Sequence, residues 1–271
     1  MKSTPYPGTQ AVLRAVALLK AFGQDRPALG LGDLAGTVGL NKTTAFRLLT
    51  ALESEGMIAR TGGGGYCLGP EMLALGSRAL GAGDLRLASR ADLQALAHDT
   101  RETATVEVLV GGKVLILDEA MGGHVVGSMP SLGTRWPAHA TSTGKAILAH
   151  LGEEERWAVL PASLARLTPR TITSREALDR ELWRVRSRGY AVSAEELEPG
   201  FVAVGAAVRS ATGAVVAAVS VGGPKSRLAA ERVAEIARRV PEAAARISER
   251  LGFRGEEAGR MVPFKRAKVK R

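Results

Sequence analysis

The chain of 271 residues is poor in features that mark several classes of protein. Its single cysteine, Cys67, excludes an internal disulfide and is typical of a reducing compartment. Its four histidines do not have metal-ligand spacing, so no metal site is expected, and no other motif requires a cofactor. Residues 1–7 do not resemble a signal peptide, and the apolar stretch after them is interrupted by Arg14 and Lys20 and is too short to cross a membrane. We therefore expect a soluble, cytoplasmic protein.

Positive charge and apolar residues are plentiful instead. The formal net charge is +10 and the sequence pI is about 10.2, which favours polyanionic partners, nucleic acid first. With 45% apolar residues, the chain is long enough for two domains with cores of their own. Residues 1–8 read as a disordered lead-in. Residues 253–271 read as a disordered basic tail that adds nonspecific attraction to DNA.

Residues 31–68 have the pattern of a DNA-binding domain. Apolar side chains recur at helical spacing after Asn41, a residue whose side-chain oxygen is suited to cap a helix. The short helical run before it ends at Gly39, and two short helices joined by a tight turn are a helix-turn-helix. Residues 12–22 predict a helix packed behind this pair, and residues 57–68 predict a hairpin with four glycines at its tip. This order is typical of a winged helix-turn-helix, although a helical bundle without a DNA role would share part of the pattern.

The outer face of the second helix carries short hydrogen-bond donors and cations, with no carboxylate before Glu53. Such a face suits a phosphate-rich partner, and this helix of the motif is the one that enters the major groove. Arg47 is the best candidate for a contact to guanine. The predicted DNA-binding residues are Asn41, Lys42, Thr43, Thr44 and Arg47 in the helix and Arg60 beside the wing.

From Asp84 onwards the pattern changes to mixed helices and strands. The predicted helices cover residues 85–100, 142–151, 153–159, 174–188 and 225–250. The predicted strands cover residues 105–110, 113–117, 124–128, 190–193, 202–209 and 214–222. An antiparallel sheet with helices packed on it is an α+β domain. The expected organisation is a winged domain over residues 9–70, a linker helix over 71–83 that ends in a flexible joint at 81–83, and an α+β domain over 84–252.

A set of motifs runs along nearly the whole chain in one order. They are GLNKTTAFRLL at residues 39–49, YCLGP at 66–70, PAHATSTGKA at 137–146, GYAVS at 189–193 and AAVSVGGP at 217–224. The first two resemble the DNA-binding domain of the IclR family of bacterial transcription regulators, and the others resemble its effector-binding domain. The resemblance implies a GAF-like fold for the second domain. It also implies homodimers, often paired into tetramers, that bind palindromic operators in double-stranded DNA.

The resemblance further implies where a small-molecule effector binds. In the family, the backbone amides that match Ser142 and Thr143 face the effector at a helix start, which the helix dipole makes receptive to an anion. The same match assigns one wall of the pocket to Val125, Ser128 and Trp136, and the opposite side to Ser193, Phe201, Ala203, Ser220 and Gly222. The alternative is that all of these are core residues of a sheet domain without a ligand, and this alternative is strongest for Val125 and Ala203.

Three of these positions depart from the oxoacid-binding members of the family. Those members carry Asp, Cys and Ser where Ser193, Ala203 and Gly222 stand here. Losing these groups removes hydrogen-bond partners for a small hydrated acid, because buried polar ligand groups need such partners. Trp136 and Phe201 offer flat apolar surface instead. We therefore expect a larger, apolar or aromatic effector, such as an aromatic acid or its derivative.

Two enzyme patterns overlap this region and neither is complete. Ser142 and Lys145 fit a Ser-x-x-Lys nucleophile motif, but its partner motifs are absent from the sequence. A phosphate loop would need glycine at His139 and Ser or Thr at Ala146. We therefore expect no enzyme activity.

The function that we favour is that of a repressor. Its binding to the operator is modulated by an effector through the linker. The competing hypothesis is an architectural DNA-binding protein that binds through charge alone, without sequence preference or effector.

Overall fold

The computed structural model describes residues 9–23, 26–72, 75, 82–123 and 131–254. The chain divides into two compact units, residues 1–83 and 84–271, and each is described by itself. Within the described residues, no helix combines the length and the apolar character that a membrane span requires.

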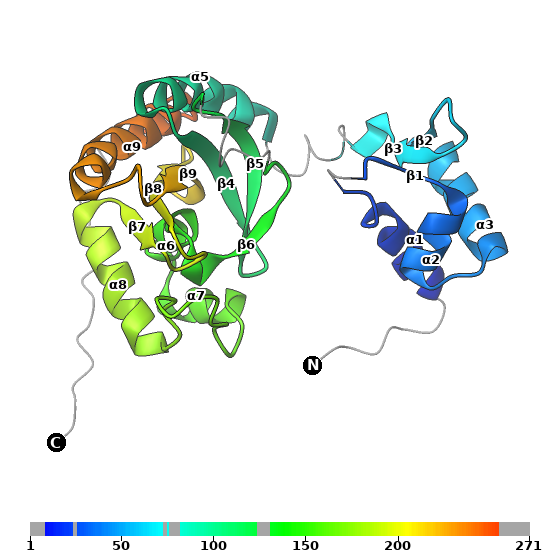
Figure 1. Cartoon of the computed structure of the whole chain (residues 1–271), viewed down its shortest axis with the longest axis horizontal. Helices are drawn as coiled ribbons and strands as arrows, with labels where there is room; N and C mark the ends of the chain where they lie inside the picture. Colours follow the sequence, from blue (N-terminus) through cyan, green and yellow to red (C-terminus); the bar gives the residue numbers. More distant parts are fainter. Residues whose placement is uncertain (1–8, 24–25, 73–74, 76–81, 124–130, 255–271) are drawn as a thin grey trace. The chain divides into compact units, whose positions relative to one another are not determined.

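The first unit is a winged helix-turn-helix (Figure 1). Its helices are α1 (Gln10–Leu19), α2 (Leu31–Val38) and α3 (Lys42–Ser54), and the wing strands are β2 (Ile58–Arg60) and β3 (Tyr66–Leu68). A two-residue strand that was not predicted, β1 (Ala28–Leu29), pairs antiparallel with β3 and completes a sheet in the order β1-β3-β2. The core is formed by Leu18, Leu29, Leu34, Leu49, Ile58 and Tyr66, so all three helices and the sheet contribute to it.

Two local features confirm the predicted turn between α2 and α3. Helix α2 ends at Gly39, whose φ of +69° lies in the left-handed region that glycine adopts without strain. Asn41 then caps α3, because its side-chain oxygen accepts a hydrogen bond of 2.8 Å from the amide of Thr44.

The second unit is a six-stranded antiparallel sheet with helices on both faces (Figure 1). The strands are β4 (Thr103–Val110), β5 (Lys113–Ala120), β6 (Arg135–Pro137), β7 (Ala191–Ala194), β8 (Phe201–Arg209) and β9 (Val215–Pro224), in the order β6-β5-β4-β9-β8-β7. Helices α5 (Ala82–Thr100) and α9 (Ala230–Arg250) cover one face. The short turn η1 (Ala138–Ala140) and helices α6 (Ser142–Leu148), α7 (Glu153–Val159) and α8 (Arg175–Arg188) lie on the other. The predicted α+β architecture is confirmed.

Several predicted boundaries were wrong. Helix α5 begins at Ala82, so two of the three residues expected in a flexible joint are helical. Helix α6 ends at Leu148 rather than at residue 151, and α9 begins at Ala230 rather than at residue 225. Residues 225–229 instead form a turn in which the amide of Leu228 donates to the carbonyl of Pro224. Strand β6 was not predicted.

Other predictions lie wholly or partly outside the described residues. These are the lead-in at 1–8, the strand at 124–128, Gly81 of the joint and most of the basic tail. In the linker helix expected over 71–80, the described residues 71, 72 and 75 are helical.

Candidate DNA-binding helix and effector site

Helix α3 buries one side and leaves a polar side open. Ala45 and Leu49 are fully buried in the first unit, whereas Lys42, Thr43 and Arg47 are exposed. Thr44 is half-buried, and Asn41 uses its side-chain oxygen for the cap. Among the described residues, neither Lys42 nor Arg47 has a hydrogen-bond or ion-pair partner, so both cations are available to a ligand.

Arg60 on β2, unlike Lys42 and Arg47 on α3, forms an ion pair within the first unit. Its Nε lies 3.1 and 3.2 Å from the two carboxylate oxygens of Glu53, and its guanidinium lies 5.1 Å from the centre of the Tyr66 ring. The side chain is 50% exposed. It therefore braces the end of α3 against the wing, and a contact with DNA would compete with Glu53.

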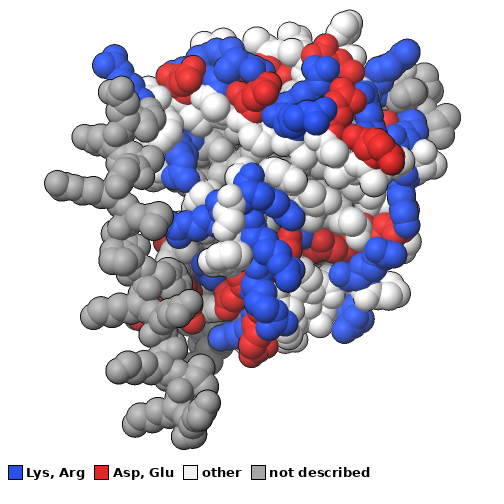
Figure 2. Space-filling view, turned by 90° about the vertical axis from the view of Figure 1, so that its left-hand side faces the viewer, with Lys and Arg blue, Asp and Glu red and all other residues white. Residues whose placement is uncertain are grey.

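Positive charge is not concentrated in the first unit. Residues 1–83 contain eight Lys and Arg against five Asp and Glu, whereas residues 84–271 contain 29 against 22. Figure 2 shows Lys and Arg side chains spread widely over one face, with Asp and Glu between them. The net charge alone therefore does not locate a DNA-binding surface, and the predicted DNA contacts depend on the exposed residues of α3.

The start of α6 lies directly against strand β8. A Cβ atom on Gly205 would come within 2.9 Å of the carbonyl carbon of Ser142 and 3.0 Å of the amide nitrogen of Thr143. Only glycine permits this approach. Ser142 and Thr143 are both buried, and Thr141 caps the helix by accepting a hydrogen bond of 3.1 Å from the amide of Gly144. The seven-residue helix is therefore held firmly over the sheet.

The sheet register brings four predicted effector-binding residues together. Ser193, Ala203 and Gly222 lie opposite one another on β7, β8 and β9, and Ser220 lies opposite Gly205. Residues that face each other across a sheet share one side, and here it is the side that meets α6. Ser193 donates a hydrogen bond of 2.8 Å to the carbonyl of Ala140, just before α6.

Phe201 joins this row from the end of β8. A Cβ atom on Gly222 would lie 2.7 Å from Cζ of the Phe201 ring, so the ring rests on the glycine backbone. Trp136 is 38% exposed and stands on the edge strand β6, and it is not part of this row. Val125 and Ser128 lie outside the described residues.

Two residues of β4 that were not predicted, Thr105 and Glu107, contact predicted effector-binding residues. The Thr105 hydroxyl lies 2.9 Å from the hydroxyl of Ser220 and donates a bond of 2.7 Å to Oε1 of Glu107. The Thr143 hydroxyl donates a bond of 2.6 Å to Oε2 of Glu107. Burial raises the pKa of the Glu107 carboxyl, and the hydrogen bonds from Thr143 and Thr105 oppose that rise. The only signal in the sequence was the alternation of polar and apolar residues along the strand.

Lys145 forms a second buried contact from α6. Its Nζ lies 2.5 Å from Oε1 of Glu196 and 2.7 Å from the carbonyl oxygen of Val192, and the side chain is 1% exposed. Burial raises the pKa of Glu196, and the charge of Lys145 opposes the rise. The second carboxylate oxygen of Glu196 has no hydrogen-bond partner among the described residues. Lys145 is thus a paired cation rather than a base for Ser142.

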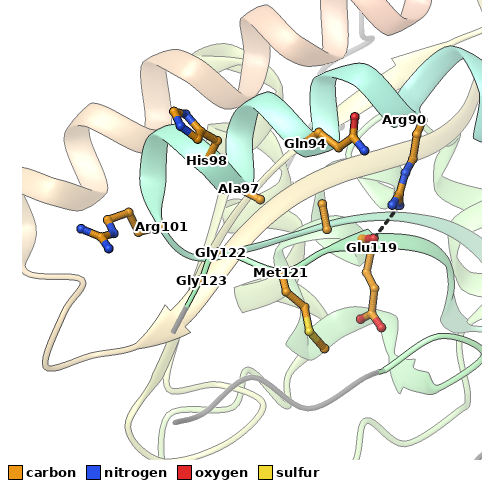
Figure 3. A pocket seen from close by; sticks show the side chains of 10 residues that line it. Arg90, Gln94, Ala97, His98, Arg101, Glu119, Met121, Gly122 and Gly123 are labelled. Atoms are coloured by element: carbon orange, nitrogen blue, oxygen red, sulfur yellow. Dashed lines mark hydrogen bonds between the residues drawn. The ribbon is translucent and has the colours of Figure 1, made fainter. Parts of the chain in front are cut away.

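An open groove of about 910 Å³ lies elsewhere in the second unit, between α5 and the end of β5 (Figure 3). It is lined by polar side chains of α5 and by Met121. Arg90 at its rim donates a hydrogen bond of 2.8 Å to the backbone carbonyl of Glu119. None of the predicted effector-binding residues lines this groove, so it is not the predicted site.

Comparisons with known proteins agree with this architecture. Residues 11–62 match the family model described as "IclR helix-turn-helix domain", and residues 77–249 match that described as "Bacterial transcriptional regulator IclR C-terminal". The chain is 31% identical over 249 residues to the HTH-type transcriptional regulator XynR of Escherichia coli, covering 91% of this chain and 99% of XynR. It is 30% identical over 253 residues to the HTH-type transcriptional repressor AllR of Salmonella typhi, covering 93% of each.

A solved structure is similar over the same extent. The crystal structure of an IclR homologue from Microbacterium hydrocarbonoxydans, complexed with 4-hydroxybenzoate, has a TM-score of 0.79 and 30% sequence identity. The match covers 89% of this chain and 98% of that one. With both family models matched in order along the chain, the protein belongs to the IclR family and is a DNA-binding transcription regulator rather than an enzyme.

Proposed function

We propose that the protein is a repressor that binds a palindromic operator as a homodimer and responds to an apolar or aromatic acid or its derivative. The observation that carries the effector part is the convergence of α6 with the inner faces of β7, β8 and β9. Ser142, Thr143, Ser193 and Ser220 are all buried there, and Ser193 donates a hydrogen bond to the carbonyl of Ala140 just before α6. The AllR relative is named a repressor, and the structural relative is a complex with 4-hydroxybenzoate, which supports both parts.

On the DNA side, α3 is the proposed recognition helix. Lys42, Thr43 and Arg47 are exposed along it and face solvent in the free protein. In this proposal Arg47 reads a guanine and the others contact nearby bases and phosphates, with Thr44 closer to the core. A bidentate arginine contact is worth about 1–3 kcal/mol of discrimination between bases.

Dimerisation follows from the geometry of DNA. Operator half-sites one helical turn apart, about 34 Å, require two recognition helices. We propose a homodimer in which the effector shifts the spacing between winged domains through the linker at residues 71–83. Dimers pair into tetramers in the same proposal. The effector acts by binding one arrangement more tightly than the other, because a ligand with equal affinity for both would shift nothing.

The preference for an apolar effector rests on the row across the sheet. Ala203 and Gly222 contribute no polar side-chain group there, and the Phe201 ring covers Gly222. A small oxoacid would leave most of its oxygens without partners, which is costly in a buried site. An aromatic ring would instead pack against the apolar surface of Phe201, Ala203 and Gly222.

A thermal-shift screen tests the effector class. Aromatic acids and their alcohol or amine derivatives should raise the melting temperature of the full chain, whereas glyoxylate and pyruvate should not. Gly222→Ser restores a hydroxyl at that position and should weaken the response to aromatic compounds, since its Cβ would displace Phe201. Stabilisation by glyoxylate or pyruvate, with no response to any aromatic compound, would contradict the proposed class.

A further inference from the structure

Among the described residues of the second unit, Glu107 is the most deeply buried carboxyl group that has no cation beside it. It lies on β4 between Val106 and Val108, and its side chain points to the α6 side of the sheet, where Thr143 contacts it. Among the described residues, no Lys, Arg or His forms an ion pair with it. The other buried acid that contacts α6, Glu196, does have such a partner in Lys145.

The hydrogen bonds around Glu107 connect two residues of the proposed effector site. Its two oxygens accept from Thr143 and Thr105, and the Thr105 hydroxyl lies 2.9 Å from Ser220. Since Thr105 gives its only hydroxyl proton to Glu107, Ser220 must donate to Thr105. The cluster is therefore a chain of donors that all run towards the carboxyl group.

The chemistry of this cluster restricts what can bind beside it. Each carboxyl oxygen has a further lone pair, so Glu107 can still accept a hydrogen bond from a ligand. A ligand carboxylate in the same place would set two acids together in a buried setting, which is unfavourable unless one is protonated. A hydroxyl or ammonium group of a ligand would instead donate a hydrogen bond to a remaining lone pair of Glu107.

We propose that Glu107 determines the specificity of the effector site, and that it selects an effector with a hydroxyl or amine at the end that reaches Thr105, Glu107 and Thr143. If the effector also has a carboxylate, that group lies away from this cluster. This inference rests on the proposed function, because it states which polar group of the effector binds in the proposed effector site. It replaces the expectation that an acid group of the effector binds at the start of α6.

Three compounds with one aromatic ring test this assignment: benzyl alcohol, benzylamine and benzoate. Calorimetric titration into the full chain should give the alcohol and the amine an affinity at least about tenfold above that of benzoate. In Glu107→Gln, which keeps the size of the side chain and replaces the acid with an amide, the affinity for benzylamine should fall about tenfold and that for benzoate should rise. Lys113→Ala, on the exposed start of β5, is the matched control and should leave all three affinities unchanged.

The ranking in the wild-type protein tests the proposal even if Glu107→Gln does not fold. Benzoate binding as tightly as the other two compounds would overturn it, as would binding of none of the three. Affinities unchanged in a folded Glu107→Gln variant would also overturn it. In that case, release of operator DNA by any of the compounds would show that the proposed function stands without Glu107. If the wild-type protein bound operator DNA no more tightly than scrambled DNA, the proposed function itself would be refuted.

Discussion

Lys145 offers a sharp test of how α6 is held over the sheet. Its side chain is 1% exposed and Glu196 is 8% exposed, so water solvates neither charged group appreciably. Lys145→Met keeps the volume of the side chain and leaves Glu196 as an unpaired buried carboxylate. Removing one partner of a buried ion pair destabilises a protein by about 3–5 kcal/mol. We expect a loss of that size in the free energy of unfolding of the second unit.

The double variant Lys145→Met/Glu196→Leu separates the charge from the packing. Replacing both members of a buried pair by apolar groups of similar size is often neutral. The carbonyl of Val192 loses its donor, 2.7 Å away, in both variants, so this cost cancels in the comparison. The double variant should therefore be more stable than Lys145→Met alone by about 3–5 kcal/mol.

Urea denaturation followed by tryptophan fluorescence measures this directly. All three tryptophans, Trp136, Trp157 and Trp183, belong to the second unit, so the first unit does not contribute to the signal. Lys145→Met should also lose stability as the pH rises from 5 to 8, because its unpaired Glu196 must then ionise in a buried position. A loss below about 1 kcal/mol for the single variant, or a double variant less stable than the single one, would refute the reasoning.

Three further predictions concern other parts of the chain. Arg47→Ala should weaken operator binding about 5- to 150-fold and relax base preference at one position, measured by fluorescence anisotropy at fixed salt; unchanged preference would remove α3 from the reading of bases. Asn41→Ala should destabilise the first unit by about 1 kcal/mol in a hydrogen-exchange experiment, because the amide of Thr44 loses its acceptor; protection unchanged across α3 would argue against the cap. Burial, with Arg209 and Arg186 nearby, lowers the pKa of His150 from 6.5 to about 4. The unfolded chain then binds more protons between these values, so the second unit should lose about 1 kcal/mol from pH 7 to pH 5, after allowance for partial exposure. His150→Gln should remove most of that loss in urea titrations at both pH values, and an equal loss in the variant would contradict the assignment.

The elements that were predicted well are those with strong local signals. Helix α3 has an apolar stripe and the capping residue Asn41, and both act within a few residues of the chain. The hairpin of β4 and β5 is closed by Gly111 and Gly112, whose positive φ angles are typical of such a turn. Strands β1 and β6 have two and three residues, too few for any alternation to appear.

The polar part of the site could not be read from local patterns. Thr105 and Glu107 alternate with Val106 and Val108, which is typical of a strand with one face in water. In the fold that polar face is buried instead, because α6 packs over it from 36 residues further along the chain and Thr143 contacts Glu107. Only the tertiary structure decides which face of such a strand is solvated.

The most direct test of the whole account is binding of the full chain to the DNA upstream of its own coding sequence. Fluorescence anisotropy would compare this DNA with a scrambled sequence at one salt concentration, with and without the aromatic acids, alcohols and amines. The account predicts tighter binding to the upstream DNA and release by a compound of this class. Equal binding to both DNAs, with no response to any compound, would contradict it and favour a protein that binds DNA through charge alone.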